Sequence, residues 1–296
     1  MDGVLNINKP SGMTSHDVVQ AVRRITREKR VGHTGTLDPM ATGVLVLCAG
    51  KATRIARYLE AGEKEYQAVM RLGVTTDTLD AEGRVLETRP YSPPDRSQLH
   101  HALKQFVGTI VQQPPAYSAI KVKGVASYKL ARQGKAEPLA PRQVAIFDIE
   151  LTAYEDPFVS LTVKCSKGVY IRTLCADLGE ALGPGAHLTS LVRTRSGRFG
   201  IDHAVTLDQI ADLAAAGSLG QVLIPLDEAL ADFPAVTVAE TDAGRIVHGN
   251  RIPWHGESTS ISSGLVRIHG PEGGLLALAR AVSGEIRPEL VFSSGS

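Results

Sequence analysis

The segment from Arg30 to Leu45, RVGHTGTLDPMATGVL, constrains the fold and chemistry of this chain more than any other stretch. It carries one carboxylate, Asp38, among three glycines that permit tight turns and close approaches: Gly32, Gly35 and Gly43. Pro39 removes a backbone donor and favours an extended conformation at Asp38. The apolar run Val44 to Leu47 predicts a buried strand or the start of a buried helix. The pattern indicates a candidate nucleophile on a stiff loop that a large substrate can reach.

A purely structural reading of these residues stays open, because an Asp-Pro pair between glycines also closes an Asx-turn. No metal-binding pattern accompanies Asp38. HExxH is absent, and the adjacent His100 and His101 cannot both face one metal from a regular helix. The cysteines lack CxxC spacing, which argues against a zinc site and a disulfide framework; they are Cys48, Cys165 and Cys175. We therefore expect no metal cofactor.

Composition is that of an ordinary soluble globular protein, with 296 residues, 43% of them hydrophobic and 21% charged. No apolar run is long enough to span a bilayer, and Met1 to Lys9 is too short and polar for a signal peptide. Unpaired cysteines fit a reducing compartment. We expect a cytoplasmic protein with no membrane segment.

A net charge of +1 means that any surface for a polyanion must be a local patch. One candidate is the stretch AVRRITREKR at residues 21–30, which holds five basic residues: Arg23, Arg24, Arg27, Lys29 and Arg30. A second comprises Arg193, Arg195 and Arg198. For both, a solvated charged face is the alternative reading.

Periodicity predicts an α+β fold, because helices and strands mix without strict βαβ repetition or internal repeats. Strands are expected at residues 4–7, 66–72, 144–154 and 158–165, and helices after Ser15 and at 51–59, 97–107, 171–182 and 207–215. Composition changes near residue 231. From there, a helix at 242–247 and strands at 265–268, 275–279 and 289–292 predict a small β-barrel.

An ordered set of motifs covers most of the first 230 residues: NKPSGMTSHDVV from Asn8, GHTGTLDPMATGVL from Gly32, KEYQAVMRLGVTTDTLDAEG from Lys64, PPAYSAIKVKGVASYKLARQG from Pro114, GVYIRTLCADLG from Gly168, LTSLVRTRSGRFG from Leu188 and PLDEAL from Pro225. Together they resemble the TruB family of bacterial tRNA pseudouridine synthases. The tail is similar, more weakly, to a PUA-type RNA-binding domain. The resemblance implies a mixed sheet with flanking helices over residues 1–230 and a PUA-like domain over 231–296.

This resemblance implies isomerisation of uridine 55 in the T arm of tRNA to pseudouridine, with no cofactor and no metal. It assigns Asp38 as the catalytic residue, acting as nucleophile or as base. Arg172 matches the family arginine that pairs with this aspartate, and its fork of donors suits that task. An ordinary interdomain salt bridge is the alternative for Arg172.

The resemblance also implies the pocket for a flipped uracil. Tyr66 is expected to stack on the base, with Tyr170 packed nearby and Leu191 closing an apolar wall. A core role is the alternative for each tyrosine. His33 is expected to fill the space left by the flipped nucleotide rather than to act as general base.

Lys9 is expected beside the active-site loop, in a structural role or as an RNA contact, and Arg193 and Arg195 are RNA-contact candidates. Residues 116–142 resemble a bacterial insertion that closes over the T loop and is mobile without RNA. Its basic residues are Lys121, Lys123, Lys129, Arg132 and Lys135.

Three other functions compete with this one. A guide-RNA-dependent relative shares the chemistry, but the intact insertion and compact tail favour an enzyme that acts alone, without a protein partner and as a monomer. A tRNA-folding chaperone would have no use for Asp38, Tyr66 and Arg172. A retaining glycosidase would need a second carboxylate about 5 Å from the first, and none shares the Asp38 motif.

Overall fold

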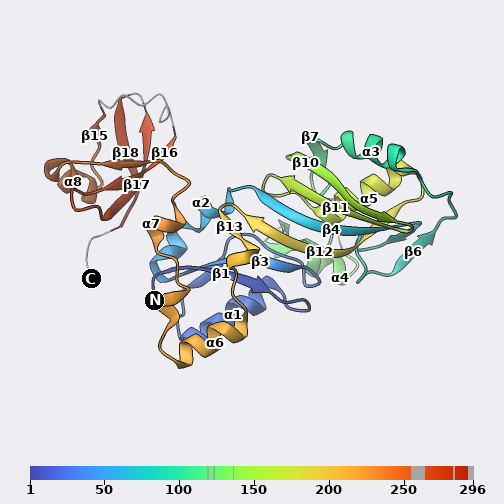
Figure 1. Cartoon of the computed structure of the whole chain (residues 1–296), viewed down its shortest axis with the longest axis horizontal. Helices are drawn as coiled ribbons and strands as arrows, with labels where there is room; N and C mark the ends of the chain where they lie inside the picture. The colour runs from blue at the N-terminus through green and yellow to red at the C-terminus, as the bar shows by residue number, and fades with distance from the viewer. Residues whose placement is uncertain (119, 123, 136, 255–263, 283, 293–296) are drawn as a thin grey trace.

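The computed structural model describes residues 1–118, 120–122, 124–135, 137–254, 264–282 and 284–292. In this part of the chain two β-sheets carry flanking helices, so the α+β prediction is confirmed (Figure 1). A nine-stranded sheet is built from the first 200 residues, and a five-stranded sheet from residues after 234.

The large sheet has the order β1-β3-β12-β4-β11-β10-β7, with β2 paired to β3 and β13 to β12. The contact between β12 and β3 is parallel and the other pairs are antiparallel. Its strands are β1 (Gly3–Lys9), β2 (Val31–His33), β3 (Thr42–Ala49), β4 (Lys64–Leu72), β7 (Gly108–Gln112), β10 (Arg142–Glu155), β11 (Phe158–Cys165), β12 (Ala186–Ser196) and β13 (Phe199–Gly200). Two short hairpins pair β5 (Val74–Thr76) with β6 (Val85–Thr88) and β8 (Lys121–Val122) with β9 (Val125–Ala126).

Strand β3 resolves the ambiguity of the apolar run after Asp38, because it is buried on both faces. Leu45 and Leu47 belong to the main core of the large sheet. Val44 and Val46 face the other way, into a cluster shared with the C-terminal sheet. A strand covered on both sides reads as a continuous apolar run rather than an alternating one.

Helices cover the large sheet in two places (Figure 1). Helix α1 (Ser15–Thr26) packs on α6 (Leu207–Ala215), and α3 (Arg96–Lys104) packs on α5 (Ile171–Leu182). Thr14 and Asp17 form a capping box at the start of α1. The shorter helices are α4 (Ser127–Arg132), α7 (Leu226–Ala229) and the 3-10 turns η2 (Ile201–His203) and η3 (Leu219–Gln221). The expected helices 171–182 and 207–215 are confirmed.

The prediction of one continuous helix at residues 51–59 was wrong. The segment is a 3-10 turn, η1 (Gly50–Ile55), followed by the short helix α2 (Ala56–Glu60). Gly50, at φ 58°, packs against the backbone and side chain at the N-terminus, because a Cβ there would lie 2.2 Å from the Met1 carbonyl oxygen. The tighter turn therefore follows from a tertiary contact that periodicity does not report.

The C-terminal sheet has the order β14-β16-β17-β18-β15 and carries one helix, α8 (Glu240–Val247). Its strands are β14 (Ala235–Thr237), β15 (Ile252–Pro253), β16 (Leu265–His269), β17 (Leu275–Val282) and β18 (Glu285–Val291). Leu278 from β17 joins Ile55 and Phe199 in an apolar cluster that connects the two sheets. Tyr58 adds a polar contact by donating to Glu289, at 2.9 Å.

Gly43 begins the apolar part of β3 where β12 approaches most closely. Its φ is +96°, and a Cβ there would lie 2.3 Å from the Arg193 carbonyl oxygen. Gly43→Ala should therefore lower the free energy of unfolding by about 2–4 kcal/mol, from backbone strain plus a clash. Gly12 is the matched control: its φ is +83° with nothing within 4 Å, so Gly12→Ala should cost about 1 kcal/mol. Equal urea unfolding midpoints for the two variants would refute this account.

Candidate active site

Asp38 lies on the loop between β2 and β3, and this loop is tied down on several sides. The buried Ser15 hydroxyl donates to the Leu37 carbonyl at 3.1 Å and accepts from the Leu37 amide at 2.8 Å. Beyond Asp38, the Gly12 amide donates to the Pro39 carbonyl at 2.9 Å. The predicted stiff loop is therefore held by contacts with the N-terminal segment, in addition to its own glycine and proline content.

Arg172, the second residue of α5, pairs with Asp38 as the sequence predicts. Its Nη2 donates to Asp38 Oδ1 at 3.0 Å, and its Nε lies 2.9 Å from Oδ2. The arginine is buried at 4% exposure, whereas the Asp38 side chain is 29% exposed. A buried cation thus holds a carboxylate whose outer edge still reaches solvent.

A second carboxylate, Asp80, shares the same guanidinium. Arg172 Nη1 donates to Asp80 Oδ2 at 3.1 Å, and both side chains are buried. Thr78 donates to the other Asp80 oxygen at 2.5 Å, and the Glu82 amide does so at 3.1 Å. Sequence analysis missed Asp80. The only available signal was its place in the KEYQAVMRLGVTTDTLDAEG motif, at the end of the acidic turn.

The two carboxylates and one arginine set the protonation of the site. Burial raises the pKa of Asp38, and the charge of Asp80 raises it further, while Arg172 acts in the opposite direction by charge and hydrogen bonding. On balance the pKa of Asp38 is raised above its usual value, and Arg172 limits that rise.

Tyr66 and Leu191 face the same side of neighbouring strands. Leu191 on β12 pairs with Ala68 on β4, two residues from Tyr66. Tyr66 is 8% and Leu191 6% exposed, and both belong to the main core together with Leu37 from the Asp38 loop. Tyr66, Leu191 and Leu37 are thus buried in one core, and the role of the first two as a wall for a flipped base stays a prediction.

Tyr170 immediately precedes α5 and so sits two residues from Arg172. Gln112 fixes its backbone, accepting from the Tyr170 amide at 2.8 Å and donating to its carbonyl at 3.0 Å. The Arg142 guanidinium lies 4.9 Å from the centre of the tyrosine ring. Tyr170 is half-buried, as a residue at the rim of a binding pocket would be.

His33 ends β2, five residues before Asp38. Within the described chain its buried Nδ1 has no hydrogen-bond partner. Burial lowers the His33 pKa, and the charge of Arg193 lowers it further, so the imidazole is neutral at pH 7. The space-filling role of His33 stays a prediction.

Lys9 makes structural contacts, which is the first of the two roles that the sequence allowed for it. The residue is 0% exposed, and its Nζ donates to the carbonyls of Pro10, Met13 and Pro39, at 2.6–3.1 Å. Burial lowers the pKa of Lys9 to about 8. The lysine joins the NKPSG segment to the Asp38 loop, with no face left for a phosphate.

The second basic patch is smaller than the sequence suggested, because Arg193 is buried; RNA contact by Arg195 stays a prediction. Arg193 is 1% exposed. Arg195 lies near Glu63 and Glu65, at 3.6 and 4.0 Å, and Arg198 donates to the carbonyl of Glu228. The first patch differs: four of its basic residues are exposed, namely Arg24, Arg27, Lys29 and Arg30.

The insertion at 116–142 reaches the site through its first residues. The Tyr117 carbonyl accepts from Arg172 Nη2 at 2.9 Å, and the Ser127 hydroxyl donates to the Ala116 carbonyl at 2.6 Å. Lys121, Lys129, Arg132 and Lys135 belong to the described part of the insertion, whereas Lys123 lies outside the described residues. The expected mobility of this segment without RNA stays a prediction.

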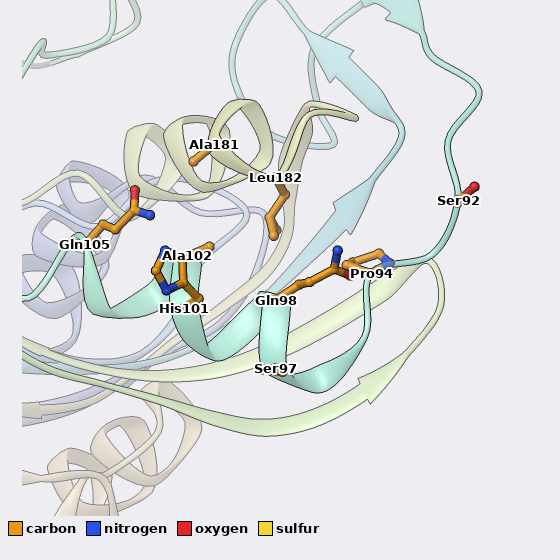
Figure 2. A pocket seen from close by; sticks show the side chains of 9 residues that line it. All are labelled: Ser92, Pro94, Ser97, Gln98, His101, Ala102, Gln105, Ala181 and Leu182. Atoms are coloured by element: carbon orange, nitrogen blue, oxygen red, sulfur yellow. The ribbon is translucent and has the colours of Figure 1, made fainter.

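A separate hollow between α3 and α5 is lined by residues such as Gln98, His101 and Leu182, which Figure 2 shows around it. It includes none of the predicted site residues. In the described chain, no group of three or more His, Cys, Asp or Glu side chains is placed to hold a metal ion. The same residues include no helix long and apolar enough to cross a membrane.

The fold is similar to that of two solved structures from an H/ACA RNP and a Cbf5-containing complex. One, titled as an H/ACA RNP bound to a substrate RNA containing 2'-deoxyuridine, superposes with a TM-score of 0.77 at 27% identity, covering 98% of this chain and 85% of that chain. Another, a Cbf5-Nop10-Gar1 complex, gives a TM-score of 0.76 at 28% identity, with the same coverage of 98% and 85%.

Sequence comparison gives the family. Residues 23–171 match the TruB family pseudouridylate synthase N terminal domain, 172–231 the tRNA pseudouridylate synthase B C-terminal domain, and 234–292 the pseudouridine synthase II TruB C-terminal domain. The chain belongs to the TruB family of pseudouridylate synthases. The tRNA pseudouridine synthase B of Thermobifida fusca is 44% identical over 99% of both chains. That of Burkholderia lata is 45% identical over 98% of this chain and 89% of its own.

Because Asp38 and Asp80 share one guanidinium, a change at Asp80 should alter the pKa of Asp38. Asp80→Asn removes a negative charge that raises the Asp38 pKa, so that pKa should fall. The Asp38 carboxyl can be followed by ¹³C NMR during a pH titration, with Asp38→Asn used to assign its resonance. Asp177→Asn is a control, because Asp177 is a carboxylate of α5 outside the Arg172 network and should leave the Asp38 titration unchanged. A higher Asp38 pKa in Asp80→Asn would contradict this account.

Proposed function

We propose that this protein converts uridine 55 in the T arm of tRNA to pseudouridine, using Asp38 as its catalytic group. The observation that carries the proposal is the partly exposed Asp38 carboxylate held by buried Arg172 inside TruB-family motifs. Relatives named tRNA pseudouridine synthase B align over nearly the full length of the chain.

Each site residue has its own role in the proposed reaction. The N1–C1′ bond of the uridine breaks, the uracil turns and C5 joins C1′. The proton on C5 is released and N1 takes up a proton, so the reaction has no net redox change and needs no group donor. Asp38 supplies either the nucleophile for C1′ or the base for a sugar proton, and the carboxylate geometry suits both. Arg172 aims the carboxylate and keeps it ionised. Tyr66, Tyr170 and Leu191 receive the flipped base, while His33 occupies the space that the base leaves.

The exposed basic residues at the end of α1 are proposed to contact tRNA phosphates, together with the insertion at 116–142. The domain of residues 231–296 is proposed to add RNA contacts in the manner of a PUA-like domain next to the catalytic domain of residues 1–230. We further propose that the protein acts in the cytoplasm, as a monomer and without a protein partner or guide RNA. Relatives at 44–45% identity are named for tRNA, whereas the chains of the H/ACA RNP and the Cbf5-Nop10-Gar1 complex are 27–28% identical.

The other candidate functions fit less well. A chaperone without chemistry has no need for two carboxylates on one buried arginine. A glycosidase needs a second carboxyl as proton donor, and Asp80 is the neighbour that the sequence did not show. However, the Asp80 oxygens already accept from Arg172, Thr78 and the Glu82 amide, so the residue is held as a buried acceptor.

Tritium release from tRNA labelled at C5 of uridine tests the proposed function directly, with no cofactor or metal added. Asp38→Asn should slow release by at least about 10³-fold, because one carboxylate supplies the nucleophile or the base. The affinity for tRNA, measured by filter binding, should change little. Retained turnover in Asp38→Asn would overturn the assignment, and binding without release by the native protein would favour the chaperone.

The basic patch predicts the salt dependence of binding. Arg27→Gln combined with Arg30→Gln should weaken tRNA binding and reduce the slope of log affinity against log salt by about one per lost phosphate contact. Arg84→Gln is the matched control, because its side chain is 88% exposed and pairs with Asp77 on the β5–β6 hairpin. An unchanged slope in the double variant would place the phosphate contacts elsewhere.

A further inference from the structure

Arg193 is a buried cation that neither the core nor the proposed reaction explains. Among the described residues Arg193 is the largest of the fully buried side chains; it lies on β12 and is 1% exposed. Among the described residues no carboxylate forms an ion pair with it, unlike Arg172. A buried charge without an opposite charge is costly and is retained only where its hydrogen bonds matter.

Two nitrogens of Arg193 bind the loop that carries Asp38. Nε donates to the Val44 carbonyl at 2.7 Å, and Nη2 donates to the Gly35 carbonyl at 3.1 Å. Gly35 precedes Asp38 by three residues, and Val44 follows it by six. The guanidinium therefore ties the start of the Asp38 loop to strands β3 and β12, in the way that the Lys9 amine ties Pro39 of the same loop to β1.

Arg193 also faces Tyr66. The two residues are direct Cα partners in the antiparallel pair of β12 and β4, so their side chains leave the sheet on the same side. Both side chains are buried, and the positive charge of Arg193 acts to lower the pKa of the Tyr66 phenol, which burial raises.

We propose that Arg193 is a positioning residue that holds the Tyr66 ring, through its hydroxyl, in register with the Asp38 loop. The inference rests on the proposed function, in which the flipped uracil stacks on this ring while Asp38 acts on its sugar. A base that stacks on this ring while Asp38 acts on its sugar needs the distance between the ring and the loop fixed within a fraction of an ångström. A phenylalanine at residue 66 would keep the ring for stacking but would lose the hydroxyl through which Arg193 is proposed to hold it.

A double-mutant cycle separates this role from simple loop support. Arg193→Lys, Tyr66→Phe and the double variant are compared by single-turnover tritium release from bound tRNA. Each single change should slow release by about ten- to a hundredfold, with the dissociation constant for tRNA within about twofold of native. In the Tyr66→Phe background, Arg193→Lys should have less than about a twofold further effect. Fully multiplicative effects would show that Arg193 acts on the loop alone and would overturn the proposal.

A second readout needs no activity, so failure of the inference is distinguishable from failure of the proposed function. In protein labelled with [¹³Cζ]tyrosine, the resonance missing from Tyr66→Phe is that of Tyr66. Arg193→Lys should shift this resonance and raise the Tyr66 pKa, because a single amine replaces the charged fork. Arg71→Lys, an exposed change on the same strand, is the control and should leave both unchanged. An unmoved Tyr66 resonance in Arg193→Lys would overturn the proposal even if the native protein released no tritium.

Folding of each variant is checked by thermal unfolding. If Arg193→Lys does not fold, Tyr66→Phe decides the matter alone, because it removes the anchored hydroxyl and leaves the arginine. A folded Tyr66→Phe protein with native single-turnover rate would overturn the proposal, and a rate lower by tenfold or more would support it.

Discussion

The ion pair between Arg172 and Asp38 is the interaction on which the rest of the site depends. A carboxylate in a water-poor pocket tends to protonate, and a buried arginine tends to be excluded unless it is paired. Each group offsets the cost of burying the other, and Asp80 pairs with the opposite side of the guanidinium. The outer edge of Asp38 is then the one part of this network that remains open to a substrate.

Three cations with different partners surround the Asp38 loop. Among the described residues, Arg172 pairs with carboxylates, Lys9 donates to backbone carbonyls, and Arg193 donates to backbone carbonyls beside Tyr66. A charged donor makes stronger hydrogen bonds to carbonyls than a neutral one, so each cation fixes backbone that glycine alone would leave free. The glycines of the loop allow these approaches, most clearly at Gly43, where the β12 backbone leaves no room for a Cβ.

Much of the fold could be predicted from sequence because local patterns report it. Helices α5 and α6 follow from apolar spacing and flanking glycines, and β4 from its alternation of buried and exposed residues. The β3 run was ambiguous, since a strand buried on both faces has no alternation. The length of the helix that contains α2 was overestimated, because contacts with the N-terminal residues tighten the turn before it. The coupling of the two sheets through Leu278 left no local signal at all.

The sequence by itself determined the chemistry: one aspartate on a glycine-rich loop, an arginine and two tyrosines in ordered motifs. Only the tertiary structure decided which charges serve that aspartate. Asp80 and Arg172 lie 92 residues apart yet share a hydrogen bond, while Lys9 and Arg193, which read as RNA contacts, are buried. Charged side chains look alike along a chain, whether they are solvated or buried. What distinguishes them is the set of carbonyls and carboxylates that folding brings around them, and this set is fixed by long-range strand and helix packing.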